Sequence, residues 1–407
     1  MRTRFLKPGA AVIAVLLLAV VSLPAASPTD STPRSWAVAM ADTIMKRNPG
    51  TPQDRLARWS YWKGYTLAGF EMLWRATGER KYFDFIQREM DPFVDKDGNL
   101  VNVNLNSLDN AMAGSMLVAL YEETHDARYR TAAGQIRKAF DNFPRNPDGG
   151  FWHNPKLTGE MWVDGVFMGQ MFLIRYGKSI GDSRYCFDEA TRQITVFARR
   201  AQKGDTGLYY HAWAAKPELA LVVPGRKVPW ADPQTGLSSE VWSEGLGWYA
   251  LIVVETLAVL PPDYPRRAEV LDIYTRLAAG LKRMQDPKTG GWFQVVDKGD
   301  RADNWTDSSG SSMFTYAIQR GIDLGLLPAK QYADVAARGY RSIVANAKID
   351  EDGLLDLYSA CDGVCVQANY ADYINYKKTV NAKEAIAGFL WATAIMERTA
   401  LEKARNR

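Results

Sequence analysis

A short break recurs five times in the sequence, between long stretches with helical periodicity. Each break is a polar turn with one or two glycines, followed by aromatic or aliphatic residues, as in DKDGNLVN, PDGGFWHN, GDTGLYYH, KTGGWFQV and DEDGLLDL. The central glycines are numbers 98, 149, 207, 290 and 353, which gives intervals of 51, 58, 83 and 63 residues. Each interval has room for two helices and a short hairpin.

Hydrophobic periodicity predicts about twelve helices and little strand. The predicted helices are Trp36–Lys46, Trp62–Thr77, Lys81–Asp91, Leu108–Thr124, Ala127–Asn142, Met161–Gly181, Cys186–Ala201, Trp242–Leu260, Ala268–Gln285, Ser312–Leu324, Ala329–Ala345 and Ala382–Lys403. About six helix pairs with glycine turns at one end either close into a double-layered barrel or stack into an open solenoid. The last helix, EAIAGFLWATAIME, is too apolar to cap a solenoid. We therefore expect one all-α domain over residues 36–403, closed as a barrel.

The N-terminus has the pattern of a secretory signal peptide over residues 1–26. A basic start, MRTRFLK, precedes fourteen apolar residues and a small-residue exit near Ala26. The apolar run is too short for a comfortable membrane span. A polar linker follows at 27–35, and we expect the mature chain to be periplasmic or secreted.

The net charge after removal of the signal gives no reason to expect nucleic acid or a membrane as a partner. Three of the 50 basic residues lie in the signal, which leaves 47 against 46 acidic residues, so the net charge falls from +4 to about +1. Cys361 and Cys365 are near enough in sequence to close a small loop in an oxidising compartment, and Cys186 is expected to be a buried small residue. The three histidines are not at ligand spacing, so no metal site is predicted.

Asp164 is the first candidate catalytic residue. In EMWVDGVFMGQMFLIRY (160–176) it falls on one helix face with Met161, Met168 and Met171, a stripe that is otherwise apolar. An ionised carboxylate does not lie on an apolar face without a partner or a function. One interpretation is a general acid/base in a sugar-sized pocket. The other is a first-turn acid stabilised by the helix dipole.

Asp109 is the second candidate, and the same two interpretations apply to it. It follows Ser107, a possible helix N-cap, in the first turn of an apolar stretch. Acids at like positions in consecutive repeats can face each other across a barrel mouth. A second carboxylate nearby helps a general acid to keep its proton near neutral pH.

Aromatic residues are concentrated around a Pro- and Gly-rich insertion at Ala214–Glu240. His211, Trp213, Trp230, Trp242 and Trp248 occur within 38 residues. These rings either fill a core or line a carbohydrate pocket, and His211 is either structural or a donor to a sugar group. Trp242 and Trp248 are six residues apart and so lie on different helix faces, which allows at most one to be core if the other lines the pocket.

Several segments, in order, resemble the unsaturated glycuronyl hydrolases of glycoside hydrolase families 88 and 105, with family 105 the nearer. They include WSYWKGYTLAGFEMLW, SLDNAMAGSMLVALYEETHDARY, GGFWH, EMWVDGVFMGQMFL, GLYYHAWA, WADPQTG and WSEGLGWYAL, and the similarity spans about residues 35–400. The resemblance implies an (α/α)6 barrel. It also implies a substrate with a 4,5-unsaturated uronic acid at its non-reducing end, and a reaction without metal or organic cofactor.

Residue roles follow from the same resemblance. Asp164 matches the acid/base that protonates carbon 4 of the enol ether before water adds at carbon 5, and Asp109 matches its partner. Trp162, His211, Trp242 and Trp248 match pocket residues, and Trp213 is a further candidate for substrate binding.

The sequence departs from the family at Glu244, where many relatives carry Arg. A cation would suit a uronate carboxylate, whereas an acid repels it or needs its own partner. Two other hypotheses stay open. One is an inverting glycosidase on the same barrel, with carboxyl groups about 6.5–9.5 Å apart. The other is an exported sugar-binding protein without catalysis.

Overall fold

The computed structural model describes residues 33, 35–223 and 225–406. The predicted signal peptide, residues 1–26, lies outside the described residues, and so does most of the predicted linker. Within the described part of the chain, no helix is long and apolar enough to cross a membrane.

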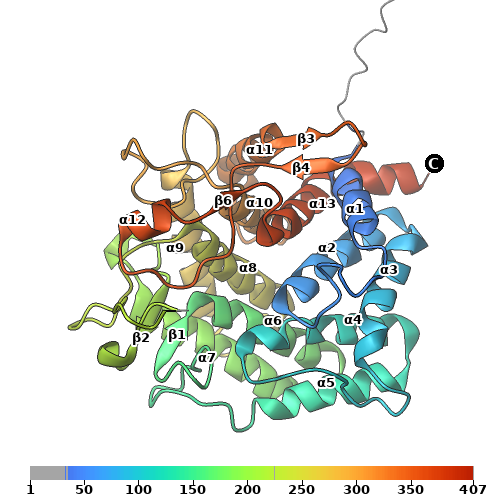
Figure 1. Cartoon of the computed structure of the whole chain (residues 1–407), viewed down its shortest axis with the longest axis horizontal. Coiled ribbons are helices and arrows are strands. Elements are labelled where there is room, and N and C mark those ends of the chain that lie inside the picture. Colours follow the sequence, from blue (N-terminus) through green and yellow to red (C-terminus); the bar gives the residue numbers. More distant parts are fainter. Residues whose placement is uncertain (1–32, 34, 224, 407) are drawn as a thin grey trace, which may run out of the picture. The chain divides into compact units, whose positions relative to one another are not determined.

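Six helices form a closed inner ring in which each contacts the next and the last returns to the first. They are α2 (Tyr61–Thr77), α4 (Gly114–Thr124), α6 (Val163–Ser179), α8 (Ser243–Val259), α10 (Ser308–Asp323) and α13 (Lys383–Arg405). An outer layer packs around them (Figure 1) and comprises α1 (Trp36–Arg47), α3 (Arg80–Met90), α5 (Ala127–Ala139), α7 (Ser183–Ala201), α9 (Arg267–Met284) and α11 (Ala329–Ala345). The predicted (α/α)6 barrel is therefore confirmed, and the open solenoid is excluded.

The repeated glycines explain how one helix pair follows another. Gly98, Gly207 and Gly290 have φ angles of 82°, 73° and 79°, a left-handed conformation that side chains disfavour. A Cβ atom on Gly207 would also meet the carbonyl oxygen of Arg276 in α9, the outer helix of the next pair. Because every break joins an outer helix to the next inner helix, all five lie at the N-terminal ends of the inner helices.

Several predicted helices begin at other residues than periodicity suggested, and two of these differences lie beside Asp109 and Asp164. The stretch Leu108–Thr124 is divided into a 3-10 turn, η2 (Leu108–Ala111), and α4. The backbone crosses α2 closely here, since a Cβ on Gly64 would lie 2.7 Å from the Cα of Ala113. Met161 belongs to a strand, so α6 starts only one residue before Asp164.

The connections between the barrel helices contain short antiparallel strands and one short helix, none of which was predicted. Strand β1 (Glu160–Trp162) pairs with β2 (Ala212–Ala214), β3 (Ala347–Ile349) with β4 (Leu355–Leu357), and β5 (Ala360–Cys361) with β6 (Lys378–Thr379). Helix α12 (Tyr370–Ile374) lies between β5 and β6 in the sequence. The β1–β2 pair joins the loop before α6 to the loop after α7.

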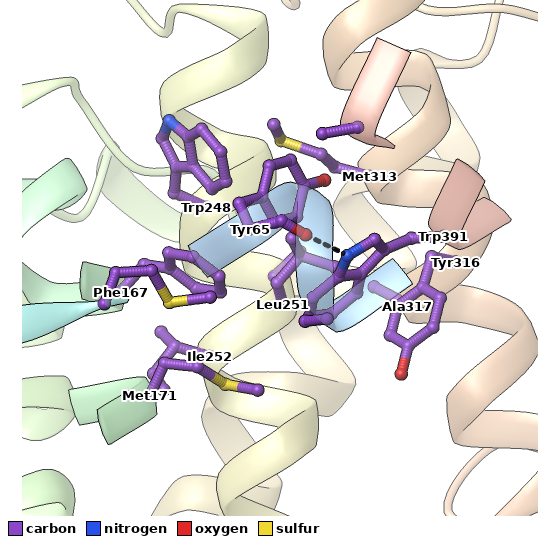
Figure 2. Packing of buried hydrophobic residues seen from close by; sticks show 14 of the residues in the cluster. Tyr65, Phe167, Met171, Trp248, Leu251, Ile252, Met313, Tyr316, Ala317 and Trp391 are labelled. Atoms are coloured by element: carbon purple, nitrogen blue, oxygen red, sulfur yellow. Dashed lines mark hydrogen bonds between the residues drawn. The ribbon is translucent and has the colours of Figure 1, made fainter. Parts of the chain in front are cut away.

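Aromatic side chains fill the barrel interior (Figure 2). Tyr65 of α2 lies with its ring centroid 4.7 Å from Trp248 of α8 and 5.0 Å from Trp391 of α13. The indole nitrogen of Trp391 donates a hydrogen bond of 2.8 Å to the backbone oxygen of Tyr65. The ring centroids of Phe167 of α6 and Trp248 lie 4.8 Å apart. The inner ring thus encloses a packed core between its two ends.

Candidate active site

A pocket of about 450 Å³ opens at the N-terminal ends of the inner helices. Ligand pockets commonly have volumes of this order. Its walls include side chains from four inner helices, namely Tyr61, Asp164, Glu244, Trp248 and Lys383, and Asp109 from the turn η2. Trp162 and His153 lie beside them. The pocket therefore contains both predicted carboxylates, Asp109 and Asp164, together with Trp162 and Trp248.

Asp164 is held by a chain of hydrogen bonds. Its Oδ2 lies 3.1 Å from Nε2 of His211, and Nδ1 of that imidazole lies 2.8 Å from the hydroxyl of Tyr373. The Tyr373 oxygen already accepts the backbone N–H of Gln367, at 3.2 Å. We assign the Tyr373 hydroxyl as the donor to Nδ1, which places the imidazole proton on Nε2 and makes Nε2–H the donor to Asp164.

His211 is also tied to the start of α6 through its backbone. Its carbonyl oxygen accepts the N–H of Val163, the first residue of that helix. Its buried ring packs 4.5 Å from Trp242, which lies behind the imidazole and not among the pocket-lining residues. Both tryptophans, six residues apart, are 1% exposed and belong to buried clusters, and of the two only Trp248 also reaches the pocket wall.

Asp109 has a different imidazole partner, which the sequence interpretation did not identify. Its Oδ2 lies 3.4 Å from Nε2 of His153, whose ring stacks on Trp162 at a centroid distance of 4.6 Å. Burial opposes protonation of His153, but the carboxylates of Asp109 and Asp164 outweigh it and raise the histidine pKa. The only sequence feature that could have indicated His153 is its position near the end of the break PDGGFWHN.

Trp213 does not line the pocket, contrary to expectation. In β2 the flanking Ala212 and Ala214 are buried and Trp213 is turned the other way by the alternation of the strand. Its indole nitrogen donates to the backbone oxygen of Thr235, and the guanidinium of Arg200 lies 4.6 Å from its ring.

Three buried acids lie at the pocket floor and behind it. Glu244 is 1% exposed, lines the pocket, and has an Oε2 without a hydrogen-bond partner among the described residues. Burial, then the carboxyl of Glu384, raises the pKa of Glu244 well above its ordinary value. Glu384 accepts a hydrogen bond from Tyr61. Burial also raises the pKa of Asp307, the N-cap of α10, to about 6.

The cysteines do not form the predicted loop. Cys361 and Cys365 are both free thiols. Cys361 is buried and held in β5 opposite Lys378, whereas Cys365 lines the pocket. Burial raises the pKa of the Cys365 thiol to about 11, so that thiol is a poor nucleophile at neutral pH.

A larger cavity of about 950 Å³ lies at the opposite end of the barrel. Its charged groups neutralise one another: Arg175 pairs with Glu71 at 2.6 Å, and Arg320 pairs with Glu255 at 2.9 Å. The smaller pocket instead holds two carboxyl groups that each contact a histidine. We therefore assign the candidate active site to the smaller pocket.

A closed (α/α)6 barrel with a ring-lined pocket and two carboxyl groups has the parts that a glycoside hydrolase requires. Comparison with known proteins makes the class specific, because the model of Glycosyl Hydrolase Family 88 matches residues 36–400. The chain belongs to this family.

Several relatives match most of the chain. A Clostridium acetobutylicum structure, described as a family 105 glycoside hydrolase, superposes with a TM-score of 0.82 at 31% identity, covering 89% of this chain and 99% of that one. The unsaturated rhamnogalacturonyl hydrolase YesR of Bacillus subtilis is 24% identical over 84% of this chain and 89% of its own length. The unsaturated glucuronyl hydrolase of Bacillus sp. GL1 shares the fold, with a TM-score of 0.62 at 15% identity over 89% and 94% of the chains.

Proposed function

We propose that this glycoside hydrolase removes a 4,5-unsaturated uronic acid from the non-reducing end of oligosaccharides that a polysaccharide lyase has produced. The observation that carries the proposal is that two carboxyl groups share one pocket and that each contacts a different histidine. Asp164 lies in hydrogen-bond contact with His211, and Asp109 lies beside His153, whose pKa is raised by the two carboxylates. The printed activities of two relatives, a rhamnogalacturonyl and a glucuronyl hydrolase, concern unsaturated sugars and support the same substrate class.

In this mechanism Asp164 is the general acid. The hydrogen bond from His211 occupies its Oδ2, so its proton is carried on Oδ1 and is available to the substrate. The double bond between carbons 4 and 5 takes this proton at carbon 4, and the ring oxygen shares the positive charge that develops at carbon 5. Asp109, which lines the same pocket and pairs with His153, is the group placed to stabilise that charge.

Water completes the reaction. It adds at carbon 5 while Asp164, now a carboxylate, accepts its proton, and the enzyme returns to its starting state. The product is a hemiketal at carbon 5. Opening of this hemiketal leaves a ketone at carbon 5 and a hemiacetal at carbon 1, which releases the remaining saccharide as an alcohol. The ring of Trp162 supplies an apolar surface for the sugar, whereas Trp248 reaches the pocket wall from within the barrel core.

The test is incubation with lyase digests of pectin, glycosaminoglycans and ulvan, following the ultraviolet absorbance of the unsaturated ring. Loss of absorbance with release of a shortened saccharide is expected for at least one digest. Turnover of saturated aryl glycosides instead would point to an inverting glycosidase and contradict the proposal. Binding by calorimetry without any product would point to a sugar-binding protein.

We also propose that the chain acts outside the cytoplasm. The support is the pattern of residues 1–26, a basic start, an apolar run and a small-residue exit. Expression of the full chain in a bacterial host, followed by fractionation and N-terminal sequencing, tests this. A mature protein beginning near residue 27 outside the cytoplasm is expected, and an uncleaved cytoplasmic chain would contradict it.

A further inference from the structure

The floor of the pocket carries a carboxyl group that the proposed mechanism does not use. Glu244 is the second residue of α8, and its side chain is buried while contributing to the pocket wall. No donor or acceptor among the described residues satisfies its Oε2. A buried polar atom without a partner is costly, so a group that enters the pocket is its natural partner.

The groups around Glu244 keep it protonated. Those that face it are Tyr61 and Tyr65 from α2, Asp164 from α6, Asp307 and Ser309 from α10, Glu384 and Lys383 from α13, and Cys361 from β5. Burial together with the three neighbouring carboxyl groups raises the pKa of Glu244, and the Ser309 hydroxyl opposes this shift without overcoming it. Lys383 directs its ammonium to Glu384 instead, with Nζ 3.4 Å from Oε1.

The surroundings nevertheless favour one negative charge in the pocket. The N-termini of three long helices, α8, α10 and α13, meet at this end of the barrel, and each carries the positive end of a helix dipole. Lys383, the first residue of α13, adds a full positive charge at the pocket wall. An anion that brings its own hydrogen-bond acceptor would therefore be stabilised next to Glu244.

We propose that Glu244 is a specificity-determining residue that donates a hydrogen bond, as a neutral carboxylic acid, to the carboxylate of the substrate's uronic acid. Lys383 lines the same pocket with its ammonium 3.4 Å from Oε1 of Glu384, so it supplies a counter-charge that is shared with Glu384. The inference rests on the proposed function, because a uronate is the anion that the pocket has to hold. It also accounts for an acid at a position where a cation is expected, since a protonated acid donates to a carboxylate and only an ionised one repels it.

A dependence of binding on pH follows. The carboxylate binds while Glu244 holds its proton, so affinity decreases as the pH rises through the elevated pKa of Glu244. A glutamine at this position keeps a neutral donor of nearly the same shape but does not titrate. Its affinity is then expected to remain constant over the same pH range.

The experiment measures binding in a background that cannot turn over. Asp164→Asn and the double variant Asp164→Asn/Glu244→Gln are titrated calorimetrically with an unsaturated uronate disaccharide from about pH 5 to about pH 9. For the single variant, the dissociation constant should rise about tenfold or more across this range, the value of one hydrogen bond to a charged group. For the double variant it should stay within about twofold. The Asp109–His153 pair is present in both and cancels in the comparison.

The methyl ester of the same disaccharide is the matched ligand control. It lacks the anion, so its weaker binding should change little with pH in either variant. A dissociation constant of the acid that is independent of pH in Asp164→Asn, or equally dependent on pH in both variants, would overturn the role of Glu244 and leave the proposed function intact. If Asp164→Asn, folded by circular dichroism, binds no unsaturated saccharide, the proposed function itself fails.

Discussion

Removal of the Tyr373 hydroxyl tests the hydrogen-bond chain that orients Asp164. The hydroxyl lies 2.8 Å from Nδ1 of His211 and 162 residues away from it in the sequence. In Tyr373→Phe, Nδ1 loses its donor and the imidazole can move its proton from Nε2 to Nδ1. The bare Nε2 then accepts a hydrogen bond from Asp164, which turns the catalytic proton towards the histidine and away from the sugar.

The size of the effect follows from one neutral hydrogen bond. Such a bond contributes about 1 kcal/mol net, which corresponds to a loss of about fivefold in kcat. KM should be unchanged, because Tyr373 does not line the pocket. Stability should also fall by about 1–3 kcal/mol, since the backbone N–H of Gln367 loses the same hydroxyl as its acceptor.

The assay is the ultraviolet rate on the unsaturated disaccharide, combined with thermal unfolding. Tyr249→Phe is the matched control, because it removes another buried hydroxyl, which donates to the backbone oxygen of Ile194 at 2.8 Å in the barrel core. It should lose stability but keep kcat. A Tyr373→Phe enzyme with the kcat of the wild type, or an equal loss of kcat in Tyr249→Phe, would refute the assignment of the His211 tautomer.

Two further outcomes are expected elsewhere in the chain. Asp109→Asn should lower the pKa of His153, which a titration monitored by nuclear magnetic resonance measures. The pKa of His153 is raised in the folded state, so the Asp109–His153 pair stabilises the fold at low pH. The stability lost in Asp109→Asn should therefore be greatest below about pH 6.5 and vanish as the pH rises through the folded-state pKa. A stability loss that does not depend on pH would contradict the pairing of Asp109 with His153. Gly207→Ala should cost more than Gly353→Ala in thermal unfolding. Both glycines have positive φ, but only the first would bring its Cβ against the backbone of Arg276, whereas the second faces open space. Equal losses would contradict the packing account.

The barrel could be predicted because it depends on signals that are local in the sequence. The glycine breaks fix where helices end, and the apolar faces fix which sides pack together, so the layered arrangement follows from spacing. The shortest elements were missed. Helix α12 has only five residues, and strands β5 and β6 have two each, too few for a hydrophobic period to emerge.

The site could be predicted only as far as single residues and a family resemblance allow. Asp109 and Asp164 stood out as acids within apolar helix starts, and the structure places both in one pocket. Their partners were not predictable from periodicity, because His211 meets Tyr373 across 162 residues and His153 comes from a loop. The protonation of Glu244 depends likewise on Glu384, 140 positions further on, which only the closure of the ring brings near.

The most direct measurement is the rate at which Asp164→Asn consumes an unsaturated disaccharide. General acid catalysis contributes about 10²–10⁴-fold, so kcat should fall by at least about a hundredfold while the disaccharide still binds. Asp334→Asn, a substitution of an exposed acid on α11, should leave the rate unchanged. A folded Asp164→Asn enzyme that removes the ultraviolet absorbance at nearly the wild-type rate would show that this carboxyl group is not the proton donor.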